Sequence, residues 1–261
     1  MKRKHMDFIP EAFPQELRAF VSRFSLYDSS CSPESRVWML DGKERFFLKR
    51  AAAGTLQTEA EMTRYFHRKG LGAEVLRYLS GEQDWLLTRA VKGEDCLHQD
   101  YLADPKRLAD TMAQMLYDLH HRAHTLCPVQ NHTERYIARA RENYAAGRYD
   151  TSLFPDNWGY SSAEEAWAVV ESGARYLKTD TLLHGDYCLP NIMLDNWKFS
   201  GFIDLDTAGV GDKHVDLFWG IWSLQFNLKT DCYRERFLDA YGRENIQEEL
   251  FRTVAAIEVF G

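Results

Sequence analysis

The sequence has no uninterrupted apolar run that approaches the roughly 18 residues of a membrane-spanning helix, so we expect no membrane partner. Its basic first residues, MKRK, are followed by no apolar segment, which argues against a signal peptide. The five cysteines are scattered and form no Cys-x-x-Cys pair, which argues against a disulfide framework or a zinc site. These absences predict a cytoplasmic protein with reduced thiols.

Positive charge is outnumbered by negative charge in this chain. The 261 residues carry a formal net charge of -7, and without clustered lysines and arginines we expect no nucleic-acid partner. An acidic surface is compatible with a cationic ligand. Hydrophobic residues make up 45% and charged residues 27%, which is typical of a globular protein. The length is sufficient for two closely packed lobes.

The first part of the chain has the pattern of a β-rich lobe. Bulky residues at 36–40 and 45–49 predict two strands, and Asp41-Gly42 between them predicts a hairpin. Apolar residues at helical spacing predict a helix over 58–69, which Gly70 ends. Two further strands are expected at 73–79 and 84–89, followed by a hinge.

After the hinge, apolar residues recur mainly at helical spacing. Helices are expected over 108–121, 133–144, 163–177 and from 215 to the end, with short strands near 192–194 and 199–203. We therefore predict an α+β protein with a small β-rich N-lobe, residues 1–91, and a larger α-helical C-lobe, residues 92–261.

The segment from Leu183 to Leu194 carries the strongest chemical signal. It contains His184, Asp186 and Asn191, and Asp204 follows ten residues further on. Two acids and an amide on turns around a short hairpin suit phosphoryl transfer, which needs a positioned acceptor hydroxyl and cations that neutralise the phosphate oxygens. Asp186 would orient the hydroxyl. Asn191 and Asp204 offer the hard oxygen ligands that Mg²⁺ prefers.

The spacing His-x-Asp-x-x-x-x-Asn matches the catalytic loop of protein kinases, although Gly185 stands where those enzymes have arginine. The stretches HGDYCLPNIML and FSGFIDLDTAGVGDKHVDL resemble the aminoglycoside phosphotransferase family almost residue by residue. The resemblance covers nearly the whole chain. It implies a two-lobed protein-kinase-like fold, ATP or GTP as phosphoryl donor, Mg²⁺ as cofactor and a small-molecule hydroxyl as acceptor.

The resemblance also implies nucleotide-binding residues in the N-lobe. Lys49 would bind the α- and β-phosphates and pair with a helix glutamate, for which Glu59 is the better match and Glu61 the competitor. Phe47 lies two residues before Lys49 and hence on the same strand face. It would stack on adenine, with core packing as an equal alternative.

Two further segments are implied to contact the nucleotide. Ser32 and Ser35 fall where the family has its phosphate-covering loop, although an ordinary turn is a fair alternative. Arg89 and Val91 lie in the segment that matches the hinge, whose backbone groups would bind adenine.

Other residues are expected to support the site without contacting ligands. The ring of His184 should hold the catalytic loop in place, and Asp216 matches a family aspartate that caps loop amides. His120 and His124 have a spacing that could suit a metal. No third ligand is evident, so packing or solvation is the expected role of both.

The substrate side departs from the family pattern. Asp156 and Glu258 match acidic substrate-binding positions. However, Trp222, Phe226 and Asn227 stand where family members carry a basic residue and then an acidic pair. The acceptor is therefore either a less charged or partly aromatic compound, or an aminoglycoside held by other acids with help from a ring such as that of Trp222.

The leading hypothesis is an aminoglycoside O-phosphotransferase that acts on a 3'-hydroxyl and would confer antibiotic resistance, as a monomer or weak dimer. A kinase for another small alcohol, such as a choline-like, sugar-amine or macrolide acceptor, is the alternative. A nucleotide-binding pseudokinase is less favoured, because the chain keeps the full set of Lys49, Asp186, Asn191 and Asp204.

Overall fold

A computed structural model describes residues 4–6, 13–31, 33, 35–149 and 159–261. Two residues of the predicted site, Ser32 and Asp156, lie outside these ranges. The chain forms two compact units. The first comprises Met1–Gly93 together with Ser200–Asp206, and the second comprises Glu94–Phe199 together with Thr207–Gly261. The boundary expected after residue 91 takes no account of the segment Ser200–Asp206.

The first unit is built on a six-stranded antiparallel sheet with strand order β1-β2-β3-β4-β6-β5. The predicted hairpin is confirmed, since β3 pairs with β4 and Leu40 lies opposite Phe46. The elements of this unit are β1 (Lys4–Met6), α1 (Gln15–Val21), β2 (Ser25–Asp28), β3 (Arg36–Asp41), β4 (Phe46–Ala52), α2 (Gln57–Arg68), β5 (Val75–Ser80) and β6 (Gln83–Arg89).

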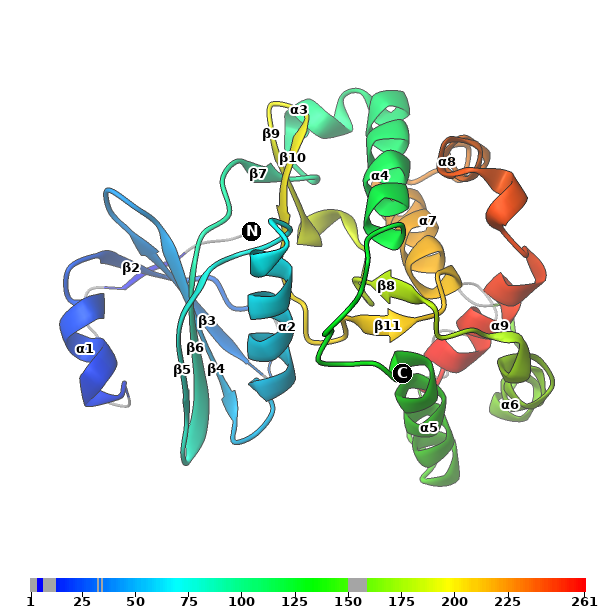
Figure 1. Ribbon diagram of the computed structural model, residues 1–261, viewed down its shortest axis with the longest axis horizontal. Coiled ribbons are helices and arrows are strands. Elements are labelled where there is room, and N and C mark those ends of the chain that lie inside the picture. The colour runs from blue at the N-terminus through cyan, green and yellow to red at the C-terminus, as the bar shows by residue number, and fades with distance from the viewer. Residues whose placement is uncertain (1–3, 7–12, 32, 34, 150–158) are drawn as a thin grey trace. The chain divides into compact units, whose positions relative to one another are not determined.

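Helices α1 and α2 cover opposite faces of this sheet (Figure 1). Successive side chains of a strand point to opposite faces. Accordingly, Trp85 and Leu87 of β6 join the core cluster that contains Leu17 of α1, whereas Leu86 packs with Ala60 of α2. In β4 the same alternation puts Phe46 and Leu48 on the α1 side. Phe47 and Lys49 therefore lie on the face that α2 covers.

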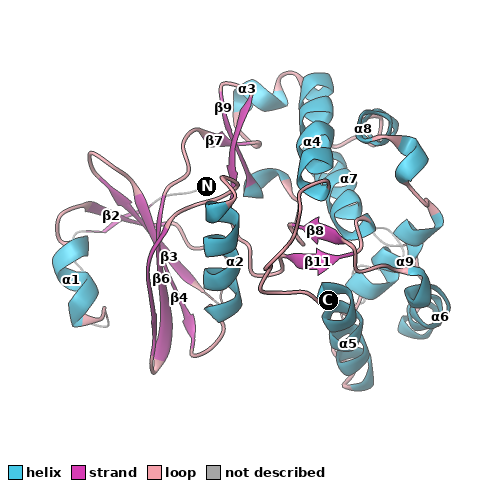
Figure 2. Ribbon diagram, in the orientation of Figure 1, coloured by secondary structure: helices cyan, strands magenta, loops and turns pink. Residues whose placement is uncertain are grey.

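The second unit is mainly helical, as Figure 2 shows by its colours, and the predicted α+β class is confirmed. Its strands are β7 (Glu94–Asp95), β8 (Thr181–Leu183), β9 (Ile192–Asp195), β10 (Lys198–Phe202) and β11 (Gly209–Gly211). Its helices are α3 (Gln99–Leu102), α4 (Pro105–His120), α5 (His132–Ala145), α6 (Ala163–Gly173), α7 (His214–Leu228), α8 (Arg234–Tyr241) and α9 (Glu249–Glu258), with short 3₁₀ turns η2 (Ala174–Tyr176), η3 (Leu189–Asn191) and η4 (Arg243–Asn245). The chain passes from the second unit to the first within β10.

Helix α4 shows why these residues form helices. Asp104 caps its start by accepting a hydrogen bond from the backbone N–H of Arg107, and Pro105 occupies the first turn, where its missing N–H has no cost. A stripe of buried residues faces the core, among them Leu108, Met112 and Leu116. No helix in the described residues is long and apolar enough to cross a membrane.

Strands β8 and β11 position the catalytic loop. They form a two-stranded antiparallel pair in which Leu183 lies opposite Gly209. The loop that begins at His184 leaves directly from the end of β8 and runs through η3 into β9. Because β8 is fully buried, the first residues of the loop are fixed by the core of the second unit.

Candidate active site

Three predicted residues meet around one ammonium group in the first unit. The Nζ atom of Lys49 lies 2.8 Å from Oε2 of Glu59 and 2.9 Å from Oδ1 of Asp204. Glu61 is instead exposed and accepts a hydrogen bond from Gln57, so the structure pairs Lys49 with the predicted glutamate. Burial alone would lower the pKa of Lys49, but the two carboxylates raise it above its ordinary value and keep the side chain charged.

Negative charge exceeds positive charge around Lys49. The pKa of Glu59 is raised to about 7. Burial is the largest cause, the Lys49 ammonium opposes it, and the carboxylates of Asp204 and Asp206 add to it. The side chain of Asp204 is 49% exposed, so it remains accessible to a ligand. Such a surplus of carboxylates favours a cation at this position.

The backbone of Asp204 has an uncommon conformation. Its φ angle of 58° lies in the left-handed region, which non-glycine residues seldom adopt. The preceding segment is anchored by the backbone N–H of Phe202, which donates to the carbonyl of Leu71 at 2.8 Å. Gly72 allows this close approach, since a Cβ atom there would lie 3.2 Å from the carbonyl oxygen of Phe202.

In the second unit, hydrogen bonds fix the orientation of Asp186. The Nδ2 atom of Asn191 donates to Oδ2 of Asp186 at 2.7 Å and to its carbonyl oxygen at 3.0 Å. The backbone N–H of Asp186 donates to Nδ1 of His184 at 3.2 Å, so the predicted loop-holding role of His184 is confirmed. Because the amide nitrogen of Asn191 faces Asp186, its Oδ1 atom is left to accept or ligate.

The buried carboxylate of Asp216 holds the start of the catalytic loop, which confirms its predicted capping role. Its Oδ2 accepts the N–H of His184 at 2.8 Å, and its Oδ1 accepts the N–H of Gly185 at 2.7 Å. Burial alone would raise the pKa of Asp216, but the hydrogen bond from His120 and those from the loop lower it below its ordinary value. Asp216 is therefore a carboxylate at neutral pH.

His120 extends this network to helix α8. Its Nε2 lies 3.2 Å from Oδ2 of Asp216, and its Nδ1 lies 2.7 Å from the hydroxyl of Tyr241. Burial lowers the pKa of His120, so the ring is neutral. Since the Asp216 carboxylate can only accept, Nε2 carries the hydrogen and Nδ1 accepts from Tyr241. The sequence predicted packing or solvation for His120. The side chain is buried, and it has a hydrogen-bond role that the sequence did not reveal.

Glycine is the only residue type that fits position 185 without strain. Its φ angle is 86°, and a Cβ atom there would lie 2.2 Å from the carbonyl oxygen of Thr207. This contact explains why glycine stands where protein kinases have arginine. It also joins the catalytic loop to the chain segment just after Asp204.

Glu258 of α9 is anchored near the catalytic loop by two donors. Its Oε1 accepts the hydroxyl of Tyr136 at 2.6 Å and Nε1 of Trp219 at 2.9 Å. In the described part of the chain both hydrogen bonds go to Oε1, which leaves Oε2 for another partner. The pKa of Glu258 is raised to about 7. Burial is the largest cause, the two donors oppose it, and the charge of Asp186 adds to it. The expectation that Trp219 is simply core needs correction, because its indole N–H orients Glu258.

The remaining predicted residues fall on three segments of the first unit and one helix of the second. The side chain of Arg89 pairs with Glu74 and Glu44 at the end of β6. Its backbone N–H donates to the carbonyl of Glu74. Among the described residues no hydrogen bond uses the N–H of Val91. Phe47, Ser35 and Trp222 are all half-buried.

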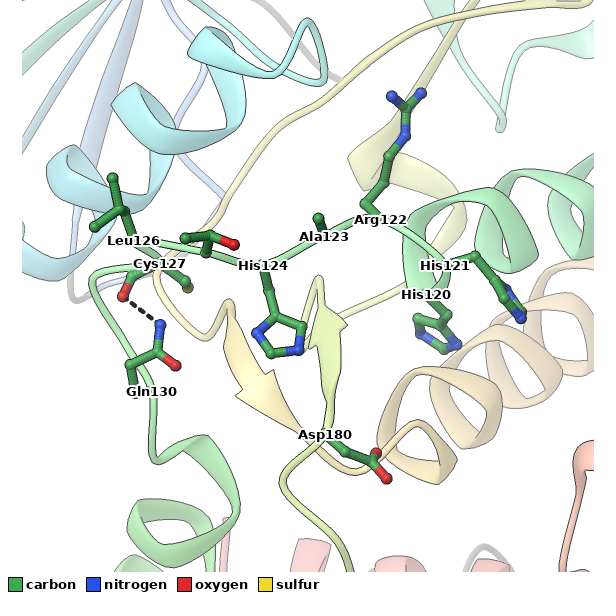
Figure 3. A pocket seen from close by; sticks show the side chains of 10 residues that line it. His120, His121, Arg122, Ala123, His124, Leu126, Cys127, Gln130 and Asp180 are labelled. Atoms are coloured by element: carbon green, nitrogen blue, oxygen red, sulfur yellow. Dashed lines mark hydrogen bonds between the residues drawn. The ribbon is translucent and has the colours of Figure 1, made fainter.

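The second unit has a pocket of about 790 Å³ at the end of α4, and Figure 3 shows the side chains that line it. Its walls come from the last residues of α4, the loop that follows, and Asp180 just before β8. His120, His121 and His124 line it, but no predicted catalytic, nucleotide or substrate residue does. Within the described ranges, no cluster of three or more His, Cys, Asp or Glu residues could hold a metal ion.

Comparisons with known proteins show which family this chain resembles. The model of the phosphotransferase enzyme family matches residues 29–254. A probable aminoglycoside 3'-phosphotransferase of Lactococcus lactis is 48% identical over 252 residues, which span 96% of each chain. The crystal structure of a type VIII aminoglycoside-3'-phosphotransferase superposes with a TM-score of 0.78 at 24% identity, covering 94% of this chain and 97% of the other.

A nucleotide complex is among the similar structures. An aminoglycoside phosphotransferase from Streptomyces rimosus, solved with ADP and streptomycin, superposes with a TM-score of 0.72 at 20% identity, over 86% of this chain and 90% of the other. These likenesses confirm the predicted protein-kinase-like fold. The protein is an enzyme that belongs to the phosphotransferase enzyme family, as the resemblance of its catalytic loop implied.

Proposed function

We propose that the enzyme transfers the γ-phosphoryl group of ATP, or of GTP, to the 3'-hydroxyl of an aminoglycoside. The observation that carries this proposal is the fixed orientation of Asp186, which Asn191 and His184 hold by hydrogen bonds on a loop anchored by Asp216. The 48% identity to a probable aminoglycoside 3'-phosphotransferase supports the substrate class. Because the proposed donor, ATP, is available in the cytoplasm, we propose a cytoplasmic location.

The nucleotide is assigned to the first unit. Lys49 binds the α- and β-phosphates, oriented by Glu59. The carbonyl of Arg89 and the N–H of Val91 bind the adenine edge, and Phe47 stacks on the ring. Ser35, together with Ser32 outside the described residues, covers the phosphates.

Mg²⁺ is assigned to Asn191 and Asp204 because of the chemistry of their side chains. Asn191 turns its nitrogen toward Asp186, so its Oδ1 is available, and Asp204 pairs with Lys49 through Oδ1 alone. Both are hard ligands of the kind that Mg²⁺ uses together with phosphate oxygens and water. When bound, the ion would neutralise charge on the transferring phosphoryl group.

Asp186 directs the acceptor oxygen toward the γ-phosphorus. A bond forms between that oxygen and phosphorus while the bond to the β-phosphate oxygen breaks, and ADP leaves with the electron pair. The hydroxyl proton passes to the Asp186 carboxylate and then to solvent. Glu258, with Asp156 outside the described residues, binds acceptor amines, and Trp222 contacts an acceptor ring. The net charge of -7 supports a cationic small molecule as partner. We propose a monomer or weak dimer as the active form.

ADP release by the purified enzyme tests this function. We expect turnover with ATP, Mg²⁺ and a kanamycin-type acceptor that has a 3'-hydroxyl, and none with the matched 3'-deoxy compound or after chelation of Mg²⁺. Equal turnover of both compounds would contradict action at this hydroxyl. Turnover of choline or a macrolide in place of any aminoglycoside would favour another small-alcohol kinase.

Replacing Lys49 by Met should raise KM for ATP and lower kcat, because the phosphates lose their ammonium partner. The variant should also lose stability on the order of 3 kcal/mol, since Glu59 is left buried without its counter-charge. The double variant Lys49→Met/Glu59→Gln separates the two effects. We expect it to regain stability in urea melts but not activity. Recovery of activity together with stability would remove Lys49 from the nucleotide site.

The affinity for a cationic acceptor should depend on pH through Glu258. Its pKa of about 7 means that the carboxylate is protonated below this value and charged above it. KM for the acceptor should therefore fall as pH rises from roughly 6 to 8. In Glu258→Gln this dependence should disappear, leaving only the titration of the acceptor amines. Identical pH profiles of KM for the two enzymes would contradict the assignment.

A further inference from the structure

Helix α7 carries a row of three aromatic side chains beside the catalytic loop. Trp219, Trp222 and Phe226 are spaced by three and four residues and so share one helix face. The rings of Trp219 and Trp222 meet edge-on at 5.3 Å between centroids, and those of Trp222 and Phe226 stack at 4.9 Å. Phe226 is 53% exposed. We call these three residues the aromatic row.

The aromatic row begins at the candidate site. Trp219 donates its indole N–H to Glu258, and its carbonyl oxygen lies 4.0 Å from Sγ of Cys188, two residues after Asp186. Ser223 of the same helix accepts the backbone N–H of Leu189 at 2.9 Å. Helix α7 is therefore bonded directly to the catalytic loop, and the row leads away from it.

The charge reverses along the aromatic row. Carboxylates of Glu258 and Asp186 lie at its inner end, while at its outer end Nζ of Lys229 lies 4.1 Å from the centroid of the Phe226 ring. Lys229 ends α7 in a left-handed conformation with φ of 57°. A cation at this position is favoured both by the ring and by the carbonyl end of the helix.

No acid on the outer part of α7 opposes this cation. After the buried Asp216, the helix has no carboxylate up to its end at Leu228. Asn227 turns its amide back onto the helix, where Nδ2 donates to the carbonyl of Ser223 at 2.7 Å. Asp231 is the nearest acid in sequence, and within the described ranges no ion pair joins it to Lys229.

We propose that the aromatic row and Lys229 determine which aminoglycosides the enzyme accepts, an inference that rests on the proposed function. The carboxylates bind amines on the ring that is phosphorylated, and the aromatic row contacts the apolar edge of the next ring. Lys229 selects against an acceptor that carries an amine at this distal position, because two ammonium groups repel each other within a screening length of about 10 Å. The favoured acceptors carry their amines on the phosphorylated ring.

The test compares two aminoglycosides that share the phosphorylated ring but differ by amines on the distal rings. The quantity compared is kcat/KM for the aminoglycoside with more distal amines divided by kcat/KM for the one with fewer. In Lys229→Glu we expect this ratio to rise about 10-fold relative to the natural enzyme, mainly through a lower KM for the amine-rich compound. Phe226→Glu should change the ratio in the same direction. Asp231→Asn is the matched control and should leave it within about twofold. KM for ATP should stay constant throughout.

Each outcome decides between two claims. An unchanged ratio in both Lys229→Glu and Phe226→Glu, with aminoglycosides still turned over, would overturn this inference and leave the proposed function intact. Absence of aminoglycoside turnover in the natural enzyme would overturn the proposed function itself. Phe226 is half exposed, so thermal melts should show that both variants fold.

Discussion

The enzyme with Asn in place of Asp186 should turn over its acceptor roughly 100- to 10,000-fold more slowly than the natural enzyme. Asn keeps the size and shape of the side chain, and its Oδ1 can still accept from Asn191, which donates to this position at 2.7 Å. The variant loses the negative charge that orients the acceptor hydroxyl and receives its proton. Steady-state kinetics should show the loss in kcat, with KM for ATP nearly unchanged.

The matched control for this variant is Asp195→Asn. Asp195 is an exposed carboxylate of the same unit at the end of β9, where its neighbour Asn196 is the one hydrogen-bond donor to it among the described residues. The same chemical change there should leave turnover within about twofold, since an exposed carboxylate outside the site contributes little. Retention of more than about a tenth of the activity in Asp186→Asn would mean that Asp186 is not the catalytic group.

Replacing Asp216 by Ala should cost on the order of 4 kcal/mol of stability. The carboxylate is fully buried and receives hydrogen bonds from the N–H groups of His184 and Gly185 and from His120. Each donor is left without its acceptor in the variant. Urea melts should show the loss, and kcat should fall with it, because the same N–H groups hold the start of the catalytic loop.

The pH dependence of stability tests whether the Asp216 carboxylate causes this loss. The pKa of Asp216 is lower in the folded protein than in the unfolded chain. Its contribution is therefore complete above the unfolded value of about 3.9 and is lost as pH falls through the folded value. The stability difference between the natural enzyme and Asp216→Asn should shrink only in this acidic range.

The matched control for Asp216→Ala is Asp118→Ala, which removes an exposed carboxylate of α4. A loss of stability in Asp118→Ala equal to that in Asp216→Ala would show that the effect is not specific to Asp216.

Local chemistry explains why much of the fold was predictable. The helix expected at 58–69 is α2 (Gln57–Arg68), and the hairpin around Asp41-Gly42 joins β3 to β4. The helical spacing of apolar residues predicted the helix, and the turn signal predicted the hairpin. Strands β8 and β11 were not predicted, since each has three residues and is stabilised by pairing with the other. Too short to show a period, such strands form only where the tertiary structure brings them together.

The site shows the same division between local and distant contacts. The catalytic loop was recognisable because His184, Asp186 and Asn191 lie within eight consecutive positions of one motif. The role of Asp216 as a cap of this loop was also recognisable, but its contact with His120 was not, because the two residues are 96 residues apart in sequence. Tyr136, which anchors Glu258, is 122 residues from it. One sequence alone shows which residue types are present but not which distant partners satisfy them.

Identification of the product tests the central claim most directly. The natural enzyme would be incubated with ATP, Mg²⁺ and a kanamycin-type aminoglycoside, and the product analysed by phosphorus–proton correlation NMR. We expect one new phosphate ester whose phosphorus couples to the proton on the 3'-carbon, and no product from the 3'-deoxy compound. A phosphate on another hydroxyl, or no phosphorylated aminoglycoside at all while ATP is bound, would contradict the account.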